Sequence, residues 1–391
     1  MRHILYLKKS KMEEKRCIFA LMKRYIITLL MCIPFITNAQ NTMLAPKHYK
    51  VGVIFPFEEK TERAKKMIEF YQGFLMAADS VKKEGISLDI YTFSSGTKEA
   101  EIMEILGKPE ISTLDILFGP VDEQQLPATI SFCKLHNIKL VLPFTNGQST
   151  IDNPHLYIPC PNNAVTTAEA AALIAKAYSD RNFIIMKSHN ENSKGTIFTQ
   201  TLSDMLVKKG NFAHILNIDG DESTFEAALK LSKDNFIVPD NTSIKTLNIL
   251  ISHLDAFKQK HPDYNISLLG HPEWQAYTST LLNSFFAFDT YVYSPYYYNA
   301  LATNTRTFEQ AFTKNFGKPM AINFPRYAMM GFDLTYYFIH EILAGNTIRT
   351  KQHVPYQNLY KFTQDTDNGG YCNRFIQLIH YTKTKQIELI R

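Results

Sequence analysis

Short apolar runs alternate along the chain with segments whose apolar residues recur every three or four positions. An apolar run of four to eight residues that stops at Gly or Pro is typical of a buried parallel strand, and the wider spacing is typical of an amphipathic helix. The runs predict strands at 49–57, 86–93, 114–118 and 139–142. The spaced residues predict helices at 64–81, 98–106 and 123–136. Four strands with intervening helices make half of a doubly wound α/β protein.

The same alternation then starts again in the second half of the chain. Strands are predicted at 182–187, 213–218, 235–238, 266–269 and 291–293. Helices are predicted at 165–178, 195–209, 243–257, 307–316 and 326–343, with one more opened by the capping box Ser223-Thr224-Phe225-Glu226. The tail, 374–381 and 386–390 around a polar turn, predicts a β-hairpin. The fold class expected from this order is α/β, with two doubly wound parallel-sheet lobes.

Short motifs lie within or at the ends of these predicted strands and helices, one after another along the chain. They are 51–57 (VGVIFPF), 72–74 (QGF) with 77–79 (AAD), 117–121 (LFGPV), 141–143 (VLP) and 161–163 (PNN). Together they resemble the periplasmic binding protein type I family, which includes leucine/isoleucine/valine-binding proteins and receptor ligand-binding regions. The resemblance covers 49–391 and implies inter-lobe crossovers, with one lobe of 48–160 plus 291–345 and another of 161–290 plus 346–391. It also implies a ligand cleft at the carboxyl ends of the strands.

The N-terminal 1–39 reads as an extension followed by a secretory signal peptide. From Met22 it has two basic residues, an apolar run of about a dozen residues and small residues before a cleavage site at Ala39. The run is too short to span a bilayer, which needs about 20 residues. Cys32 follows a poor lipoprotein box, so cleavage after Ala39 is favoured over a lipid anchor. A periplasmic or cell-envelope location is therefore expected.

Charge and cysteine content narrow the function classes. The 391 residues include 42 Lys and Arg and 37 Asp and Glu, and this net positive charge would suit a nucleic-acid or membrane partner. Eight of these basic and two of these acidic residues lie in 1–39, so the remainder has 34 against 35. The basic excess belongs to the signal segment, and no nucleic-acid partner is expected. Five cysteines without a CxxC pair exclude a disulfide scaffold and the usual structural zinc sites.

Loops after the predicted strands supply the candidate ligand-binding residues, because ligands of open α/β sheets bind beyond the carboxyl ends of the strands. These residues are Asp122, Glu123, Thr145, Asn146, Gly147, Gln148, His189, Asn190, Asn241, Trp274, Tyr296 and Tyr297. Amino-acid-binding members of the family usually carry small hydroxyl residues after the third and fourth strands. Here Asp122 and Phe144 stand in those stretches, and a carboxylate about 4 Å from Asp122 would meet up to ~4 kcal/mol of repulsion at an effective dielectric of 20. A cationic ligand, a sugar, a peptide fragment or no ligand at all is therefore expected.

Each candidate also has a purely structural interpretation. Asp122 and Glu123 favour a helix N-terminus, and Asn146-Gly147 is a turn signal. Trp274 and the tyrosines of 291–298 are as suitable for packing as for ligand contact. A metal shared by His189 and His271 is not expected, since nothing sets their separation. Asp219-Gly220-Asp221 lacks the Glu of a calcium loop and reads as a turn before a helix.

The sequence contains no Walker A loop, GxGxxG, HExxH or GxSxG motif, so no catalytic residues, cofactor or metal are expected. One hypothesis is an exported solute-binding or sensory protein that closes two lobes on a small polar ligand. Its partner would be a small molecule and, for transport, an ABC transporter. The alternative is a ligand-free interaction module of the same fold that regulates cell-envelope enzymes. Fold does not decide between them.

Overall fold

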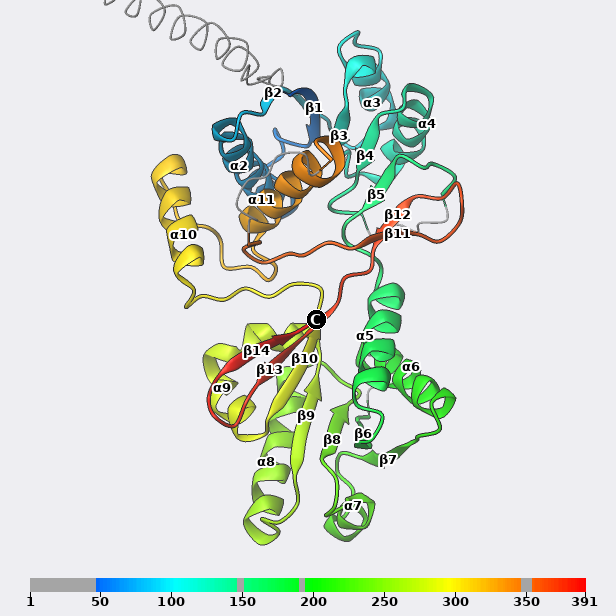
Figure 1. Cartoon of the computed structure of the whole chain (residues 1–391), viewed down its shortest axis with the longest axis vertical. Helices are drawn as coiled ribbons and strands as arrows, with labels where there is room; N and C mark the ends of the chain where they lie inside the picture. Colours follow the sequence, from blue (N-terminus) through cyan, green and yellow to red (C-terminus); the bar gives the residue numbers. More distant parts are fainter. Residues whose placement is uncertain (1–46, 146–150, 190–193, 346–353) are drawn as a thin grey trace, which may run out of the picture. The chain divides into compact units, whose positions relative to one another are not determined.

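The computed structural model describes residues 47–145, 151–189, 194–345 and 354–391. The expected signal segment and the predicted site residues Asn146, Gly147, Gln148 and Asn190 lie outside these ranges. The described chain forms two α/β lobes, each with a seven-stranded, mostly parallel sheet flanked by helices (Figure 1). The predicted fold class is confirmed. No helix within the described ranges is long and apolar enough to cross a membrane.

The first sheet has the strand order β11-β12-β5-β4-β3-β1-β2. Its strands are β1 (His48–Phe55), β2 (Ser87–Ser94), β3 (Ile116–Phe118), β4 (Lys139–Val141), β5 (Leu156–Ile158), β11 (Phe362–Gln364) and β12 (Tyr371–Asn373). β11 runs antiparallel to β12, and the other neighbouring strands are parallel. The first strand ends at Phe55, two residues before the predicted end, because Pro56 has no N–H to continue the ladder.

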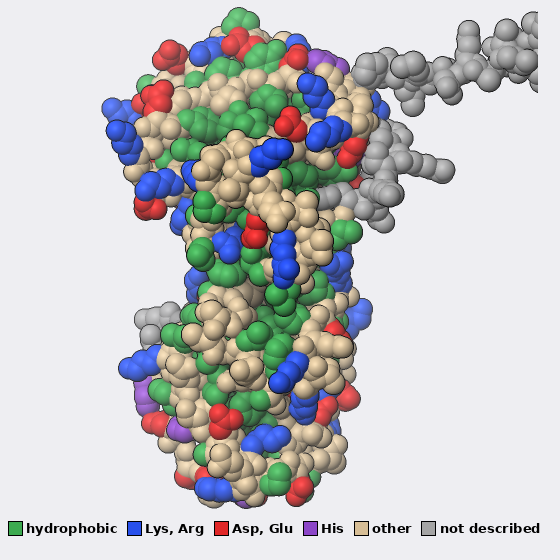
Figure 2. Space-filling model, turned by 90° about the vertical axis from the view of Figure 1, so that its left-hand side faces the viewer, with side chains coloured by type: hydrophobic (Ala, Val, Ile, Leu, Met, Phe, Trp, Pro, Cys, Tyr) green, Lys and Arg blue, Asp and Glu red, His purple; other side chains and the backbone are tan. Residues whose placement is uncertain are grey.

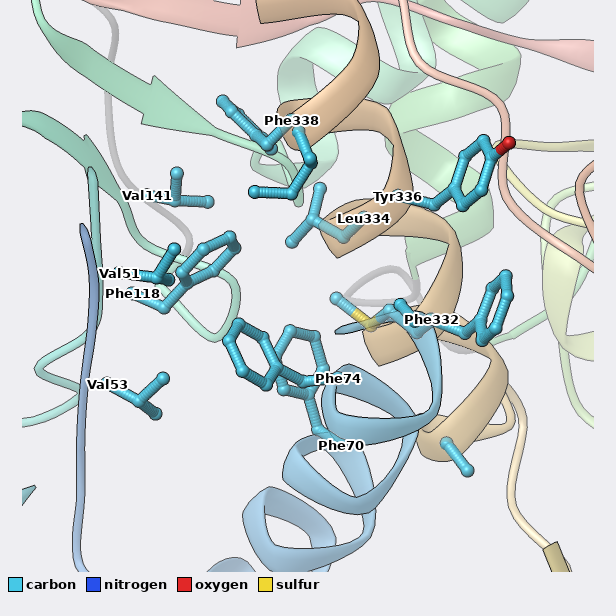
Figure 3. Packing of buried hydrophobic residues seen from close by; sticks show 14 of the residues in the cluster. Val51, Val53, Phe70, Phe74, Phe118, Val141, Phe332, Leu334, Tyr336 and Phe338 are labelled. Carbon is cyan, nitrogen blue, oxygen red and sulfur yellow. The ribbon is translucent and has the colours of Figure 1, made fainter. Parts of the chain in front are cut away.

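Helices cover both faces of this sheet, so each strand contributes alternate side chains to two separate cores. They are α2 (Glu62–Lys83), α3 (Glu99–Leu106), α4 (Leu126–His136), α10 (Thr303–Phe316) and α11 (Tyr327–Tyr337), with 3-10 turns at Ile111–Thr113 and Glu123–Gln125. Val53 of β1 faces α2 and α11, whereas its neighbour Ile54 faces α3 and α4. Figure 3 shows the first of these cores, where Phe70 and Phe74 of α2 lie between Val53 and Phe118 on one side and Phe332 on the other.

α2 and α11 cross at two glycines. A Cβ added to Gly73 would lie 1.8 Å from the carbonyl oxygen of Ala328, and one added to Gly331 would lie 2.0 Å from that of Phe70. Both distances are far below van der Waals contact, so the two helix backbones touch only because these positions lack a side chain. The rest of the core on this face of the sheet is packed around this crossing.

The second sheet has the order β14-β13-β10-β9-β8-β6-β7. Its strands are β6 (Asn182–Lys187), β7 (Ala213–Asn217), β8 (Asn235–Pro239), β9 (Ile266–Gly270), β10 (Thr290–Ser294), β13 (Gln377–Tyr381) and β14 (Ile387–Ile390). β13 and β14 form the predicted antiparallel tail hairpin, and β13 pairs antiparallel with β10.

Two helix layers cover the second sheet. One comprises α5 (Asn163–Ala177) and α6 (Lys194–Lys208), and the other comprises α7 (Glu222–Ala228), α8 (Ile244–Lys260), α9 (Thr278–Ala287) and the 3-10 segment Pro272–Tyr277. Phe183 and Ile184, which are neighbours on β6, pack on opposite layers, as in the first lobe.

Two predicted lobe assignments require correction. β10 lies in the second sheet beside β9, although 291–345 was assigned to the first lobe. Conversely, β11 and β12 lie in the first sheet beside β5, although 346–391 was assigned to the second lobe. The chain therefore crosses between the lobes after β5, after β10 and after β12. β5, β11 and β12 have three residues each, too few to show a strand period.

Two helix boundaries also differ from prediction. Asp221, not Ser223, caps α7, and its carboxylate accepts a hydrogen bond from the N–H of Thr224 at 2.8 Å. A carboxylate at the N-cap satisfies an otherwise unpaired N–H and carries the charge that the helix dipole favours. The segment predicted as one helix at 326–343 changes at Phe338 from α11 to a π-helical turn, Phe338–Leu343.

The glycine crossing predicts a strong stability effect. Gly73→Ala should lower the free energy of unfolding by about 2–3 kcal/mol or more, because backbone atoms of α11 must move to admit the Cβ. Chemical denaturation measures this. Gly107→Ala is the matched control, since its Cβ would meet only atoms at 3.5 Å and beyond and its φ is −72°. A Gly73→Ala variant as stable as Gly107→Ala would contradict the close approach.

Candidate functional site

The candidate site consists of the loops at the carboxyl ends of the parallel strands, where polar groups reach solvent and α/β proteins bind their ligands. Eight of the twelve predicted residues are described: Asp122, Glu123, Thr145, His189, Asn241, Trp274, Tyr296 and Tyr297. Since β3 and β4 are neighbours, the loop of Asp122 lies next to that of Thr145. Since β6 and β8 are neighbours, the loops of His189 and Asn241 also adjoin.

Asp122 has structural partners on two sides. Its carboxylate accepts a hydrogen bond from the N–H of Gln124 at 3.3 Å and lies 3.6 Å from the guanidinium of Arg63 on α2. Arg63 also donates a hydrogen bond to the carbonyl oxygen of Val121 at 2.8 Å. The charge of Asp122 is thus partly compensated, and its repulsion of a nearby carboxylate is weaker than the sequence alone suggests. Glu123 remains exposed beside it.

Three half-buried rings, Phe57, Phe144 and Tyr327, form what we call the aromatic shelf at the ends of β1 and β4 and the start of α11. Phe57 and Phe144 both contact the ring of Phe55, with centroid distances of 5.9 and 5.7 Å. Phe144 also lies 6.0 Å from Tyr327. The ammonium group of Lys66 lies 5.7 Å from the centre of the Tyr327 ring. The shelf therefore combines flat apolar surface with one adjacent cation.

The sequence did not single out Phe144, Tyr327 or Lys66 as site residues. Phe144 lies in a loop that was recognised as a candidate, and its ring is the signal that could have identified it. Tyr327 and Lys66 lie on helices, and only the close crossing of α2 and α11 brings them together. Thr145, which follows Phe144, has a buried hydroxyl without a hydrogen-bond partner among the described residues.

In the second lobe, the polar side chains after β6 and β8 mostly hold their own loops. Buried Asp240 accepts a hydrogen bond from the N–H of Ser188 at 2.8 Å. The side-chain oxygen of Asn241 accepts from the N–H of Ser243 at 2.9 Å, and its amide lies 3.4 Å from the Ser188 hydroxyl. These bonds join the two loops and use most of the hydrogen-bonding capacity of Asn241.

His271 is a buried linker between strand ends. Its Nε2 lies 2.8 Å from the carbonyl oxygen of Pro239, and its Nδ1 lies 3.4 Å from the Tyr293 hydroxyl. Because a carbonyl only accepts, Nε2 carries the proton and Nδ1 can accept from Tyr293. Burial lowers the pKa of His271, so the ring is neutral at pH 7.

His189 and His271 have separate hydrogen-bond partners. His189 is exposed, and its Nε2 lies 3.0 Å from a carboxylate oxygen of Asp219. Among the described residues there is no group of three His, Cys, Asp or Glu side chains that could hold a metal ion.

Trp274 lies in the core and not on the surface of the site. Its ring has no exposed area and stacks on Phe285 with a centroid distance of 5.7 Å. It also packs directly over Gly270, where an added Cβ would lie 2.0 Å from the ring. Of the two interpretations open for Trp274, the structure supports packing.

Tyr296 and Tyr297 lie on the crossover that leaves β10. Tyr296 forms an antiparallel bridge with Asn358, and the N–H of Tyr297 donates to the carbonyl oxygen of Gln357 at 3.0 Å. Buried Asp333 of α11 holds the same segment, because its carboxylate accepts from the N–H groups of residues 356, 357 and 358 at 2.8–2.9 Å. Burial raises the pKa of Tyr297 to about 12. Both tyrosines are half-buried. Backbone contacts with residues 357 and 358 hold the crossover that carries them.

The environment of His271 predicts a pH effect on stability. Its pKa is below the unfolded value of about 6.5, so the unfolded chain binds more protons as the pH falls and the folded state loses stability below about pH 6.5. His271→Gln keeps a donor for Pro239 but cannot be protonated. Between pH 8 and 5.5, its free energy of unfolding should fall less than that of the wild type in urea titrations. Parallel curves for His271→Gln and the wild type would contradict the assignment.

Solved structures of two kinds resemble this fold. A putative branched-chain amino acid ABC transporter protein from Rhodospirillum rubrum has a TM-score of 0.60 and 11% sequence identity, over 88% of this chain and 100% of that one. The C-domain of LpoA from Haemophilus influenzae, a regulator of PBP1A, has a TM-score of 0.54 and 14% identity, over 88% and 100%. Full-length LpoA has a TM-score of 0.57 over 89% of this chain and 60% of its own, again at 14% identity.

No family model and no curated protein sequence matches the chain. At 11–14% identity the structural likeness shows the fold alone. The two lobes, their strand orders and these neighbours together show the type I periplasmic binding protein fold.

Proposed function

We propose that this protein is an exported solute-binding or sensory protein that closes its lobes on a small polar ligand and catalyses no reaction. The observation that carries the proposal is the aromatic shelf, three half-buried rings at the ends of β1 and β4 and the start of α11. Small-molecule sites are mostly apolar and aromatic, with a few placed polar groups that set orientation. The shelf offers that surface at the edge of the sheet where open α/β folds bind ligands.

The ligand class follows from the charges near the shelf. The guanidinium of Arg63 compensates part of the negative charge of Asp122, and the carboxylate of Glu123 is exposed beside it. An anionic ligand would be repelled by these carboxylates and a cationic one by Lys66 beside Tyr327, whereas a sugar or a neutral peptide fragment would be repelled by neither. Sugar rings and peptide side chains also have apolar faces that stack on flat rings. We therefore place a sugar or a peptide fragment first among the ligands to be tested.

A second candidate function is regulation of a cell-envelope enzyme without a small ligand. The hydrogen bonds of Asp240, Asn241 and His271 favour it, because polar groups that already have partners inside the lobe have little left for a ligand. The likeness to the LpoA C-domain is compatible with this role. The two functions differ in whether a small molecule stabilises the protein.

A thermal-shift screen of sugars, muropeptides, amino acids and polyamines tests the proposal. A cognate ligand at 100 times its Kd should stabilise the folded protein by about 2.7 kcal/mol. Tyr327→Ala and Phe144→Ala should weaken binding at least tenfold, since each removes a ring of the shelf. The melting temperature of each unliganded variant reports whether it is folded.

Phe212→Ala serves as the matched control, because this ring is 55% exposed and lies in the second lobe just before the edge strand β7. It should bind like the wild type. A screen in which no compound class shifts the wild-type melting temperature would contradict the solute-binding proposal and favour the regulatory one.

A further inference from the structure

A groove of about 700 Å³ lies between α10 and the segment of residues 318–326. We call it the basic groove, because its charged lining residues are Arg306, Lys314 and Arg326 against the single carboxylate of Glu309. None of these residues belongs to the candidate site above. Figure 2 shows the side of the molecule on which α10 lies, and Lys and Arg side chains outnumber Asp and Glu over the middle of this face.

The period of α10 produces one wall of the basic groove. Residues 306, 310 and 314 follow one another at intervals of four, and residue 313 is three positions after 310, so all four share one helix face. Phe308 and Phe312 occupy the opposite face and are buried in the core of the first lobe. Arg306 and Lys314 are two turns apart, which separates them along the groove by about 12 Å at 1.5 Å per residue.

Arg326 forms the other charged wall and is held in place by its surroundings. Its guanidinium lies 4.6 Å from the centre of the Tyr298 ring and 5.7 Å from that of Phe324. One of its terminal nitrogens donates to the carbonyl oxygen of Ala321 at 2.7 Å. A guanidinium fixed by stacking and a hydrogen bond loses little side-chain entropy when it binds an anion.

The positive charges of the groove are only partly compensated, because buried Glu69 lies close enough to Arg326 for the guanidinium to oppose the rise in the pKa of that carboxyl. Glu309 accepts a hydrogen bond from the Tyr298 hydroxyl at 2.6 Å, which engages one of its oxygens. Within the described ranges, no carboxylate lies at salt-bridge distance from Arg306, Lys314 or Arg326. The groove therefore presents a net positive charge in a chain whose acidic and basic residues nearly balance beyond residue 39.

We propose that the basic groove binds an acidic peptide segment in an extended conformation. A strand advances about 3.3 Å per residue, so about four residues span the 12 Å between Arg306 and Lys314. Ile322, which lines the groove and is 84% exposed, offers an apolar contact for a residue between the acidic ones. The occupant is thus a short run of Asp and Glu with one apolar residue among them.

Two other anions fit the groove less well. A small dicarboxylate is shorter than the distance between Arg306 and Lys314 and would contact one end of the groove only. Single-stranded nucleic acid gains affinity from aromatic rings on which bases stack. Among the described residues that line the groove none is aromatic, and the adjacent ring of Tyr298 has one face against the guanidinium of Arg326.

Fluorescence anisotropy with an acetylated, amidated Asp-Glu-Leu-Glu-Asp peptide, labelled with a fluorophore, tests the proposal on the full chain. Wild-type protein should bind the peptide in 50 mM NaCl, and binding should weaken at least fivefold in 300 mM NaCl because exposed charges are screened. The Asn-Gln-Leu-Gln-Asn analogue should not bind. The double variant Arg306→Gln, Lys314→Gln should bind the acidic peptide at least tenfold more weakly.

Matched substitutions distinguish the groove from general charge. Lys82→Gln with Lys83→Gln removes two exposed charges at the end of α2 and should change the Kd less than twofold. Ile322→Ser should weaken binding about threefold, whereas Leu301→Ser, at another exposed apolar position, should not. The melting temperatures of these surface variants should match the wild type, which separates loss of binding from loss of fold.

Three results would overturn the proposal. They are absence of binding up to 1 mM peptide in 50 mM NaCl, equal loss of affinity in the Lys82 and Lys83 control, and equal or tighter binding of glutarate or of a 12-nucleotide oligothymidylate. Each is independent of the thermal-shift screen, so failure here leaves the proposed function of the strand-end site untouched.

Discussion

Parallel strands covered by helices on both faces leave no place for polar chemistry except at their ends. In this protein Val53 and Ile54, adjacent on β1, enter two different cores, and Phe183 and Ile184 do the same on β6. A polar group placed within such a strand would lose its hydration without gaining a partner. Polar side chains such as Asp122, Asp240 and His271 therefore lie in loops that follow the strands, where the candidate site also forms.

The two lobes meet this constraint in different ways. The first lobe covers its strand ends with aromatic rings, so that Phe57 and Phe144 continue the core outward around Phe55. The second lobe covers its strand ends with buried polar side chains that bond to neighbouring backbone, such as Asp240 and His271. The first surface is suited to contact with a flat apolar ligand, and the second is a rigid frame.

Two buried carboxylates connect the core of the first lobe to its outer segments. Asp333 of α11 accepts three backbone N–H groups from residues 356–358, which lie beside the crossover of Tyr296 and Tyr297. Glu69 of α2 accepts the N–H of Ala321, and burial raises its pKa despite that bond. The carbonyl oxygen of Ala321 in turn accepts a hydrogen bond from Arg326. The wall of the basic groove is therefore anchored on α2, the helix that also carries Lys66 and Arg63. Backbone groups of Ala321 and of residues 356–358 thus connect the outer segments of the lobe to the buried carboxylates of α2 and α11.

Local pattern alone determined much of this protein. The strand expected at 182–187 is β6 (Asn182–Lys187), and the alternation of strands and helices predicted two doubly wound lobes. Such patterns depend on the direction in which successive side chains point, which the backbone imposes over a few residues. The candidate loops were located for the same reason, because they follow from where each strand ends.

Only the tertiary structure decided which surfaces meet. It assigned β10 to the second sheet and β11 and β12 to the first, placed Trp274 in the core, and brought Arg63 to Asp122. The aromatic shelf and the basic groove also depend on contacts between elements that are distant or irregular in sequence. The pairing of apolar faces is settled by shape and by close contacts such as that of Gly73 with Ala328, which no short stretch of sequence encodes.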